Sequence, residues 1–235
     1  MLKSLPSPYN AVVLGVPGGI GGAIYEKLSS DSNCEHAFAF SRQTDPAIDY
    51  ARPETLKAAA KHVEGICGEV HLLIIATGIL TAPDGSPPEK AFSHLSGSTM
   101  QDMFAVNATG PALALQALMP LLDRKYRTLT ATLSARVGSV GDNKLGGWIS
   151  YRASKAALNQ ITHTAAIELS RKNRQAVCVA LHPGTIETDL SKPYAKNRFT
   201  HSTDACAENL LSVLDDLAPE ASGGFYDYAG VEIAW

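Results

Sequence analysis

The sequence predicts an α/β protein in which a doubly wound parallel sheet carries helices on both faces. Three observations support this prediction: short apolar runs alternate with helical segments, a glycine-rich turn follows the first apolar run, and no linker or repeat divides the 235 residues. Near-continuous apolar strands between helices are typical of a parallel sheet that is buried on both sides. We therefore expect one domain spanning residues 1–235.

The expected elements follow one another in strict alternation. We expect strands at Ala11–Leu14, Ala37–Phe40, Val70–Ala76, Leu129–Leu133 and Val177–Leu181, and helices at Ile20–Ser29, Pro53–Gly65, Thr99–Leu122, Trp148–Arg171 and Thr203–Leu217. Pro111 falls inside a helical pattern and predicts a kink or a late helix start. Thr81–Ser98 and Pro183–Thr200 interrupt the alternation, and long loops at strand ends of this fold class cover ligands.

The composition argues against several classes of partner. A net charge of −3 gives no electrostatic reason to expect binding to nucleic acid or to an anionic membrane. No apolar run approaches the ~20 residues of a membrane helix, and no secretory leader is visible, so a cytoplasmic protein is expected. The four cysteines are scattered without Cys-x-x-Cys spacing, which predicts neither a disulfide framework nor a metal site.

The glycine-rich turn has the form Gly15-x-x-x-Gly19-x-Gly21, with Ile20 inside it, and it joins the first strand to the first helix. Glycine permits the positive φ of a tight turn and lets a pyrophosphate approach backbone N–H groups. The helix N-terminus adds unpaired donors and partial positive charge. The turn therefore predicts a dinucleotide site, although a plain tight turn is the alternative.

The end of the second strand indicates which dinucleotide is preferred. An acidic residue at this place would bind the ribose hydroxyls of NAD(H), but Ser41 and Arg42 stand here instead. Arginine pairs with a 2′-phosphate, which favours NADP(H) over NAD(H). The alternative is that Arg42 is a solvated loop residue.

Tyr151 and Lys155 are four residues apart within a segment that reads as helix, so they share a face. A neighbouring ammonium favours phenolate, and we expect it to lower the pKa of the Tyr151 hydroxyl toward the working pH of a general acid. An ordinary surface pair is the alternative for an isolated Tyr-x-x-x-Lys.

Together these motifs resemble the short-chain dehydrogenase/reductase family, in particular its C-signal (C-factor) and carbonyl-reductase branch. The resemblance covers nearly the whole chain and implies a Rossmann-type fold. It assigns Asp49 to adenine, and it implies that two further segments bind cofactor. These comprise Ala76, Thr77 and Gly78 after the third strand, and Pro183, Gly184, Thr185 and Thr188 near the nicotinamide.

The resemblance also implies an active site. Tyr151 would exchange the proton, Lys155 would hold the nicotinamide ribose, and Asn107 would position Lys155 through water. The family's carbonyl-polarising serine is harder to place, because counting back from Gly138 puts Ala135 there. Ser134 is our candidate, with Ser139 as the alternative, and a site without a serine donor also remains open.

The function implied is NADP(H)-dependent hydride transfer to or from a small carbonyl or alcohol substrate. The alternative is a dinucleotide-binding signalling or redox-sensing protein of the C-signal type, with little or no turnover. Apolar faces on Thr99–Leu122 and Trp148–Arg171 predict a homodimer or homotetramer. No metal is expected to take part.

Overall fold

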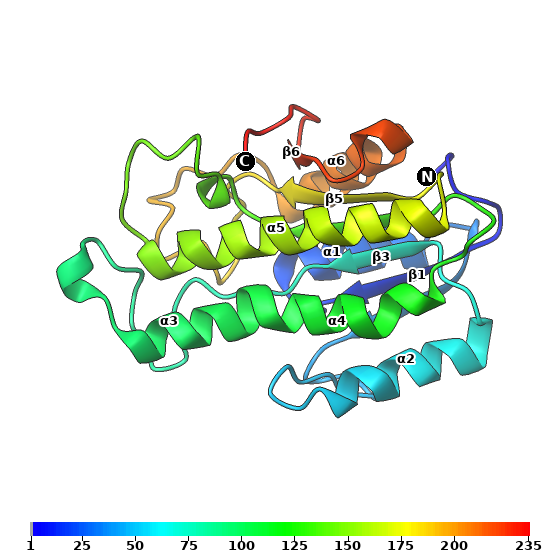
Figure 1. Ribbon diagram of the computed structural model, residues 1–235, viewed down its shortest axis with the longest axis horizontal. Helices are drawn as coiled ribbons and strands as arrows, with labels where there is room; N and C mark the ends of the chain where they lie inside the picture. Colours follow the sequence, from blue (N-terminus) through cyan, green and yellow to red (C-terminus); the bar gives the residue numbers. More distant parts are fainter. Residues whose placement is uncertain (1) are drawn as a thin grey trace.

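Six parallel strands form the central sheet, in the order β2-β1-β3-β4-β5-β6 (Figure 1). The computed structural model describes residues 2–235. The strands are β1 (Tyr9–Leu14), β2 (Cys34–Phe40), β3 (Leu72–Ile75), β4 (Leu129–Leu133), β5 (Val177–His182) and β6 (Phe225–Asp227). The predicted doubly wound sheet is confirmed, and β6 is a strand that the sequence analysis missed.

Helices cover both faces of the sheet. One face carries α2 (Glu54–Cys67), α4 (Gly110–Leu118) and α5 (Ile149–Lys172), and the other carries α1 (Gly19–Ser29) and α6 (Thr203–Asp216) (Figure 1). Successive strand residues divide between the two sides: Val13 belongs to the core under α1 and α6, and Val12 to the core under α2, α4 and α5. Burial on both faces explains why the strands read as continuous apolar runs.

The predicted helix Thr99–Leu122 is in fact an interrupted helical run. It consists of α3 (Gly97–Phe104), a π-helical turn at Ala105–Thr109, α4, and a short 3₁₀ turn. Pro111 sits in the first turn of α4, where its missing N–H costs least, so the expected late start occurs there.

This run, Gly97–Leu121, is 25 residues long with a mean hydropathy of 1.2, enough by length and composition to cross a membrane. The expectation that no segment reaches such a length was therefore wrong. The run packs against α2 and α5 within the fold, and core helices of soluble proteins pass the same test. It gives no argument for a membrane protein.

The sheet changes its direction of winding at β1, which lies between β2 and β3. In open α/β sheets ligands bind in the crevice outside the carboxyl ends of the strands at such a point. The glycine turn follows β1, and Ala76–Gly78 follow β3. These two of the predicted cofactor segments therefore lie at this crevice.

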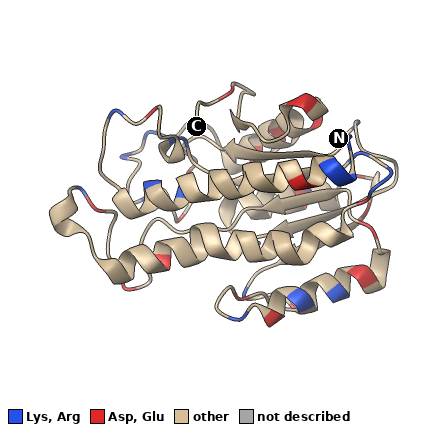
Figure 2. Cartoon of the chain, viewed as in Figure 1, with Lys and Arg blue, Asp and Glu red and all other residues tan. Residues whose placement is uncertain are grey.

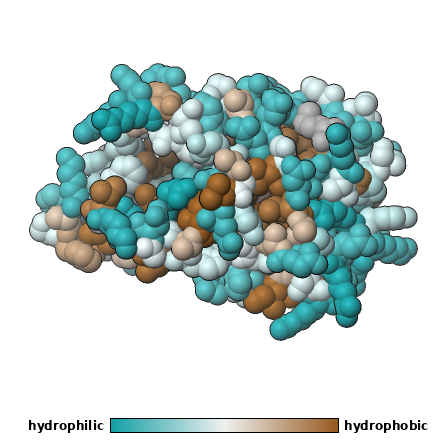
Figure 3. Space-filling model, turned by 90° about the horizontal axis from the view of Figure 1, so that it is seen from above, coloured by the Kyte–Doolittle hydropathy of each residue, from teal (hydrophilic) through white to brown (hydrophobic). Residues whose placement is uncertain are grey.

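The outer surface has no single dominant apolar region in the view from above. Figure 3 shows separate apolar patches among polar side chains on that face. Scattered exposed apolar residues are ordinary on a folded protein and need no ligand to explain them.

Candidate active site

The glycine turn forms a cradle that side chains would fill. Gly15 has a φ of +100°, and a Cβ added there would lie 2.9 Å from the carbonyl carbon of Ala76. A Cβ on Gly21 would lie 2.6 Å from the carbonyl oxygen of Gly15. The turn is closed by Gly18, whose N–H donates to the Gly15 carbonyl at 3.0 Å. The glycines are thus required by geometry, and the close backbone approach that a pyrophosphate needs is present.

The segment after β5 lies directly over this turn. A Cβ added to Gly19 would come within 2.6 Å of Thr188 Cγ2. Gly184 adopts a φ of +83°, and the Thr185 N–H donates to Thr200 Oγ1 at 3.0 Å. The structure therefore brings together the predicted glycine turn and the predicted Pro183–Thr188 segment, which are far apart in the sequence.

The residues after β2 are folded into a tight local network. The Ser41 N–H donates to Thr44 Oγ1 at 2.9 Å, and Ser41 Oγ accepts from the Gln43 N–H. Arg42 is exposed and makes no hydrogen bond or ion pair within residues 2–235, and its charge helps to lower the pKa of Asp49.

Asp49 is engaged by its own loop. Its carboxylate accepts from the Ala51 N–H at 3.0 Å and from Arg52 Nε at 3.1 Å. The Ala51 N–H, followed by the Arg52 guanidinium, holds the pKa of Asp49 below its usual value. The predicted adenine contact of Asp49 stays a prediction, and it would have to be made beside these bonds.

Tyr50 is a site residue that the sequence analysis missed. Its hydroxyl pairs with Thr77 Oγ1 at 2.7 Å, and its ring occupies the space that a side chain at Gly110 would need. Tyr50 thereby ties the loop after β2 to the end of β3 and to α4. Nothing in the local sequence distinguishes it from an ordinary aromatic residue.

Tyr151 lies on the first turn of α5, with only 7% of the residue exposed. It packs in an apolar cluster with Leu80 and Met103, and its ring meets that of Trp148 edge-on at 6.1 Å between centroids. Its hydroxyl has no hydrogen-bond partner in the part of the chain that the structure describes. Burial raises the pKa of Tyr151, so the hydroxyl carries its proton at neutral pH.

Lys155 follows one turn later and is also buried. Its Nζ donates to the Leu133 carbonyl at 2.8 Å and lies 5.9 Å from the centroid of the Tyr151 ring. Burial lowers the pKa of Lys155 to about 8. The expected lowering of the Tyr151 pKa is thus not found in this structure. The ammonium bonds a strand carbonyl rather than the phenol oxygen, and desolvation of the phenol outweighs its influence.

The depressed pKa of Lys155 predicts a pH dependence of stability. Between about pH 8 and the ordinary lysine value of 10.5, the unfolded chain holds a proton that the native chain has lost. Stability therefore rises with pH in this window, by about 1.4 kcal/mol per unit at most. Urea unfolding at several pH values measures this rise in the free energy of unfolding. Lys155→Met should flatten this rise, whereas the exposed Lys172→Met should retain it.

Asn107 connects three parts of the site from the π-helical turn. It is fully buried, its Nδ2 donates to the Ile79 carbonyl at 2.9 Å and to Ser154 Oγ at 3.1 Å, and its Oδ1 accepts from the Ile79 N–H. A Cβ on Gly78 would lie 3.3 Å from both Asn107 Oδ1 and Lys155 Nζ. Asn107, Gly78 and Lys155 are therefore neighbours, as the motifs predicted, while the water-mediated role of Asn107 stays a prediction.

The two candidate serines do not contact Tyr151. Ser134 Oγ donates to Asn159 Oδ1 at 2.6 Å, and Asn159 lies eight residues after Tyr151, about 12 Å along the helix. Ser139 is buried, and its Oγ accepts from the Asp142 N–H. These contacts do not favour either serine as the carbonyl-polarising donor.

Ser134 does not bond to Tyr151 because of the direction in which the side chains point at the end of β4. Thr132 and Ser134 point to the α5 side, where they meet Thr162 and Asn159. Ala135 instead packs in the apolar cluster around Tyr151, where the family's serine would be expected. Asn159 could have been recognised in the sequence, because it lies one further turn along the helix face of Tyr151 and Lys155.

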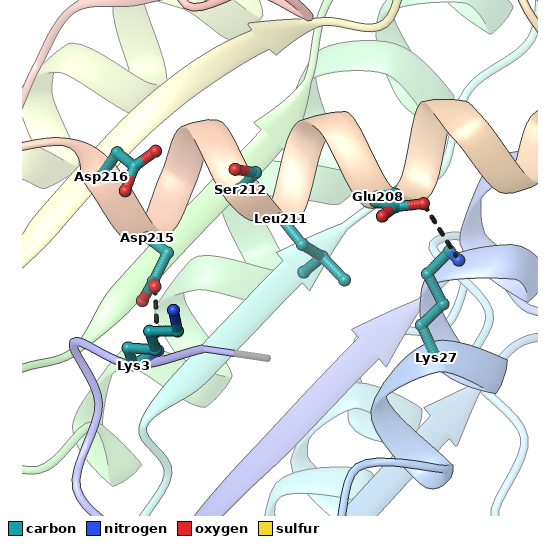
Figure 4. A pocket seen from close by; sticks show the side chains of 7 residues that line it. All are labelled: Lys3, Lys27, Glu208, Leu211, Ser212, Asp215 and Asp216. Atoms are coloured by element: carbon teal, nitrogen blue, oxygen red, sulfur yellow. Dashed lines mark hydrogen bonds and ion pairs between the residues drawn. The ribbon is translucent and has the colours of Figure 1, made fainter.

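A separate surface hollow of about 360 Å³ lies beside α6, away from Tyr151. Figure 4 shows two contacts among the residues that line it: the backbone N–H of Lys3 donates to Asp215 at 2.8 Å, and Lys27 Nζ lies 3.8 Å from Glu208. We assign no ligand to it. Within residues 2–235, no group of three or more His, Cys, Asp or Glu side chains could hold a metal ion.

Comparison with known proteins agrees with this geometry. The family model described as short chain dehydrogenase matches residues 9–198. The chain belongs to the short-chain dehydrogenase family. It is therefore an NAD(P)-dependent oxidoreductase that acts on carbonyl or alcohol groups by hydride transfer.

Matches to individual relatives indicate the branch of the family. It is 35% identical to C-signal of Myxococcus xanthus over 145 residues, which cover 62% of this chain and 84% of that protein. It is 27% identical to 1-hydroxy-2-glutathionyl-2-methyl-3-butene dehydrogenase of Rhodococcus sp. over 81% of this chain and 80% of that protein. The structure of NADPH-bound carbonyl reductase from chicken fatty liver superposes with a TM-score of 0.83 at 26% identity, covering 98% of this chain and 100% of the other. The C-signal and carbonyl-reductase branch is thus confirmed.

Proposed function

We propose that this protein is an NADP(H)-dependent carbonyl reductase for small, largely apolar aldehydes or ketones. The observation that carries the proposal is the Tyr151 hydroxyl, which bonds to no group within residues 2–235, belongs to a residue only 7% exposed, and stands one helical turn from a buried lysine. The hydroxyl oxygen is not among the fully buried unbonded polar atoms of residues 2–235, so a ligand can reach it. A substrate carbonyl oxygen would satisfy it.

Each residue of the site has its own role in the proposed reduction. A bound NADPH would supply the hydride that the carbonyl carbon accepts. Tyr151 donates its proton to the carbonyl oxygen, and the raised pKa keeps that proton in place at neutral pH. Lys155 holds the nicotinamide ribose and replaces the proton, and Asn107 fixes the position of Lys155 relative to Gly78.

The walls of the site favour an apolar substrate. The side chains packed around Tyr151 include Leu80, Met103, Ala135 and Trp148, none of which carries charge. A charged substrate would lose its hydration here without gaining an ionic partner. A small carbonyl compound with an aromatic or aliphatic flank fits this surrounding.

Arg42 supports a preference for NADP(H), because it is exposed and unpaired beside the expected ribose position. Arg42→Ala should weaken NADPH binding about tenfold or more, the cost of a lost charge-assisted bond, and leave NADH binding unchanged. Titration of cofactor fluorescence measures the affinities for NADPH and for NADH. The control is Arg171→Ala at the far end of α5. Equal effects on both cofactors would refute the assignment.

The overall proposal is tested by comparing NADPH and NADH binding and then screening carbonyl compounds with the preferred cofactor. We expect tighter binding of NADPH and turnover of at least one apolar aldehyde or ketone. Tight binding without turnover of any carbonyl would contradict the proposal.

One observation favours a second candidate, a dinucleotide-binding signalling or redox-sensing protein. Ala135 stands where the carbonyl-polarising serine is expected, and C-signal is among the relatives. This candidate predicts cofactor binding with little turnover, and a protein partner that binds only when cofactor is present.

We also propose that the protein is a cytoplasmic homodimer or homotetramer that pairs through α4 and α5. Figure 2 shows no charged residue on α4, whose sequence is GPALALQAL. Light scattering on the purified protein gives the oligomeric state, and a monomer would refute this pairing.

A further inference from the structure

The proposed reaction calls for a second hydrogen-bond donor at the substrate carbonyl oxygen. As hydride reaches the carbonyl carbon, the π electron pair moves to oxygen, and enzymes usually place more than one donor at such an oxygen. Tyr151 is one donor. The methyl group of Ala135 stands beside it where a hydroxyl is expected, and Ser134 is turned toward Asn159. A second donor must come from another residue near Tyr151.

Two hydroxyls beside the apolar cluster of Tyr151 meet each other. Thr81 Oγ1 and the Tyr194 hydroxyl lie 2.6 Å apart, although the residues are 113 positions apart in the sequence. They belong to the two irregular segments, after β3 and after β5, that the sequence predicted would cover a ligand. The pair therefore joins the two loops over the site.

The pair belongs to the surroundings of Tyr151. The Tyr194 ring meets Trp148 at 5.9 Å between centroids, and Trp148 meets Tyr151 at 6.1 Å. Thr81 stands between Leu80 and Ala82, which are buried in the same apolar cluster as Tyr151. Thr81 and Tyr194 are both half-buried against this apolar cluster, where a bond to a developing charge is stronger than in open water.

We propose that Tyr194, oriented by Thr81, is the second hydrogen-bond donor to the substrate carbonyl oxygen. Thr81 donates to the Tyr194 oxygen, and the Tyr194 O–H points to the substrate. Only Tyr151 transfers a proton, while Tyr194 keeps its own. The inference rests on the proposed carbonyl reduction and assigns to Tyr194 the role that Ala135 cannot perform.

Trp148 is the competing donor, because its indole N–H has no partner within the described residues. The hydroxyl pair is favoured because a donor whose orientation is fixed by a neighbour needs little reorganisation as charge develops.

The test measures steady-state reduction of para-nitrobenzaldehyde by NADPH. Tyr194→Phe should lower kcat by about 10²-fold, as loss of an oxyanion donor does, with NADPH affinity unchanged. Thr81→Val should lower kcat less, since it removes only the orienting partner. The matched control is Tyr126→Phe, because Tyr126 is 57% exposed and lies on the loop before β4.

A rescue variant separates a donor from a structural residue. Ala135→Ser combined with Tyr194→Phe should recover at least about tenfold of the lost kcat, because it restores a donor beside Tyr151. If Tyr194 were merely structural, Ala135→Ser would change kcat by the same factor in the wild-type and Tyr194→Phe backgrounds, whereas the proposal predicts a larger gain in Tyr194→Phe. If Tyr194→Phe fails to fold, Thr81→Val with and without Ala135→Ser makes the same comparison.

Each remaining outcome counts against the assignment. A Tyr194→Phe enzyme with wild-type kcat overturns it while the proposed function stands. A large loss of kcat in Trp148→Phe, with none in Tyr194→Phe, moves the role to the indole. A hundredfold loss in Ser134→Ala alone returns the role to the serine. A wild-type protein that binds NADPH but reduces no carbonyl compound overturns both proposals.

Discussion

Tyr151→Phe is expected to lower kcat for carbonyl reduction by about 10²- to 10⁴-fold, the range for loss of a general acid. The hydroxyl is the only part removed, and it makes no hydrogen bond within residues 2–235. The ring contacts with Trp148 and Met103 remain. Folding and NADPH affinity should therefore stay close to wild type, so the effect falls on the chemical step. Stopped-flow reduction under single-turnover conditions measures that step directly.

The control for this variant is again Tyr126→Phe, which removes an exposed hydroxyl from the loop before β4. A Tyr151→Phe enzyme that retains most of its kcat would contradict the assigned proton donor. A variant that also loses NADPH affinity would place the hydroxyl in cofactor binding instead.

Lys155→Met is expected to lower kcat by about 10²-fold or more and to weaken NADPH binding as well. Methionine keeps most of the apolar stem but loses the ammonium, which bonds the Leu133 carbonyl at 2.8 Å and stands beside Gly78 at the cofactor crevice. Because burial already disfavours the charge, the native fold should tolerate the change or gain stability. Steady-state kinetics, cofactor titration and urea unfolding at pH 7 separate these effects.

Lys172→Met is the matched control, since Lys172 is an exposed residue of the same helix paired with Glu168 at 2.6 Å. Loss of kcat in Lys155→Met with no change in NADPH affinity would refute the contact with the nicotinamide ribose. A large loss of stability at neutral pH would show that the lysine is required for folding rather than disfavoured by burial.

The fold was predictable because strands that are buried on both faces have continuous apolar sequences. β1 to β5 were all expected, with errors of a few residues at their ends. β6 was missed because a strand of three residues carries too little pattern to be recognised. The interrupted run from α3 to α4 was expected as one helix, since a π-helical turn leaves no clear sign in a short sequence window.

The site was predictable where the backbone itself is the functional part. The glycine turn and the Tyr151–Lys155 spacing are properties of local geometry, and the structure places Lys155 Nζ beside Gly78 after β3. Their roles in binding and catalysis stay predictions. The direction of Ser134 was not predictable, because it depends on where β4 leaves the sheet and on a partner, Asn159, in another element. The contact between Thr81 and Tyr194 was hidden for the same reason, since it depends on how two irregular loops meet.

The central claim is that hydride passes from the nicotinamide to a carbonyl carbon beside Tyr151. It is tested most directly with NADPH that carries deuterium in the transferable position at C4, para-nitrobenzaldehyde as substrate, and mass spectrometry of the alcohol formed. We expect one deuterium on the carbinol carbon of the product, and about 10²- to 10⁴-fold slower formation of this product by Tyr151→Phe. Alcohol without deuterium, or equal deuterated product from Tyr151→Phe, would contradict it.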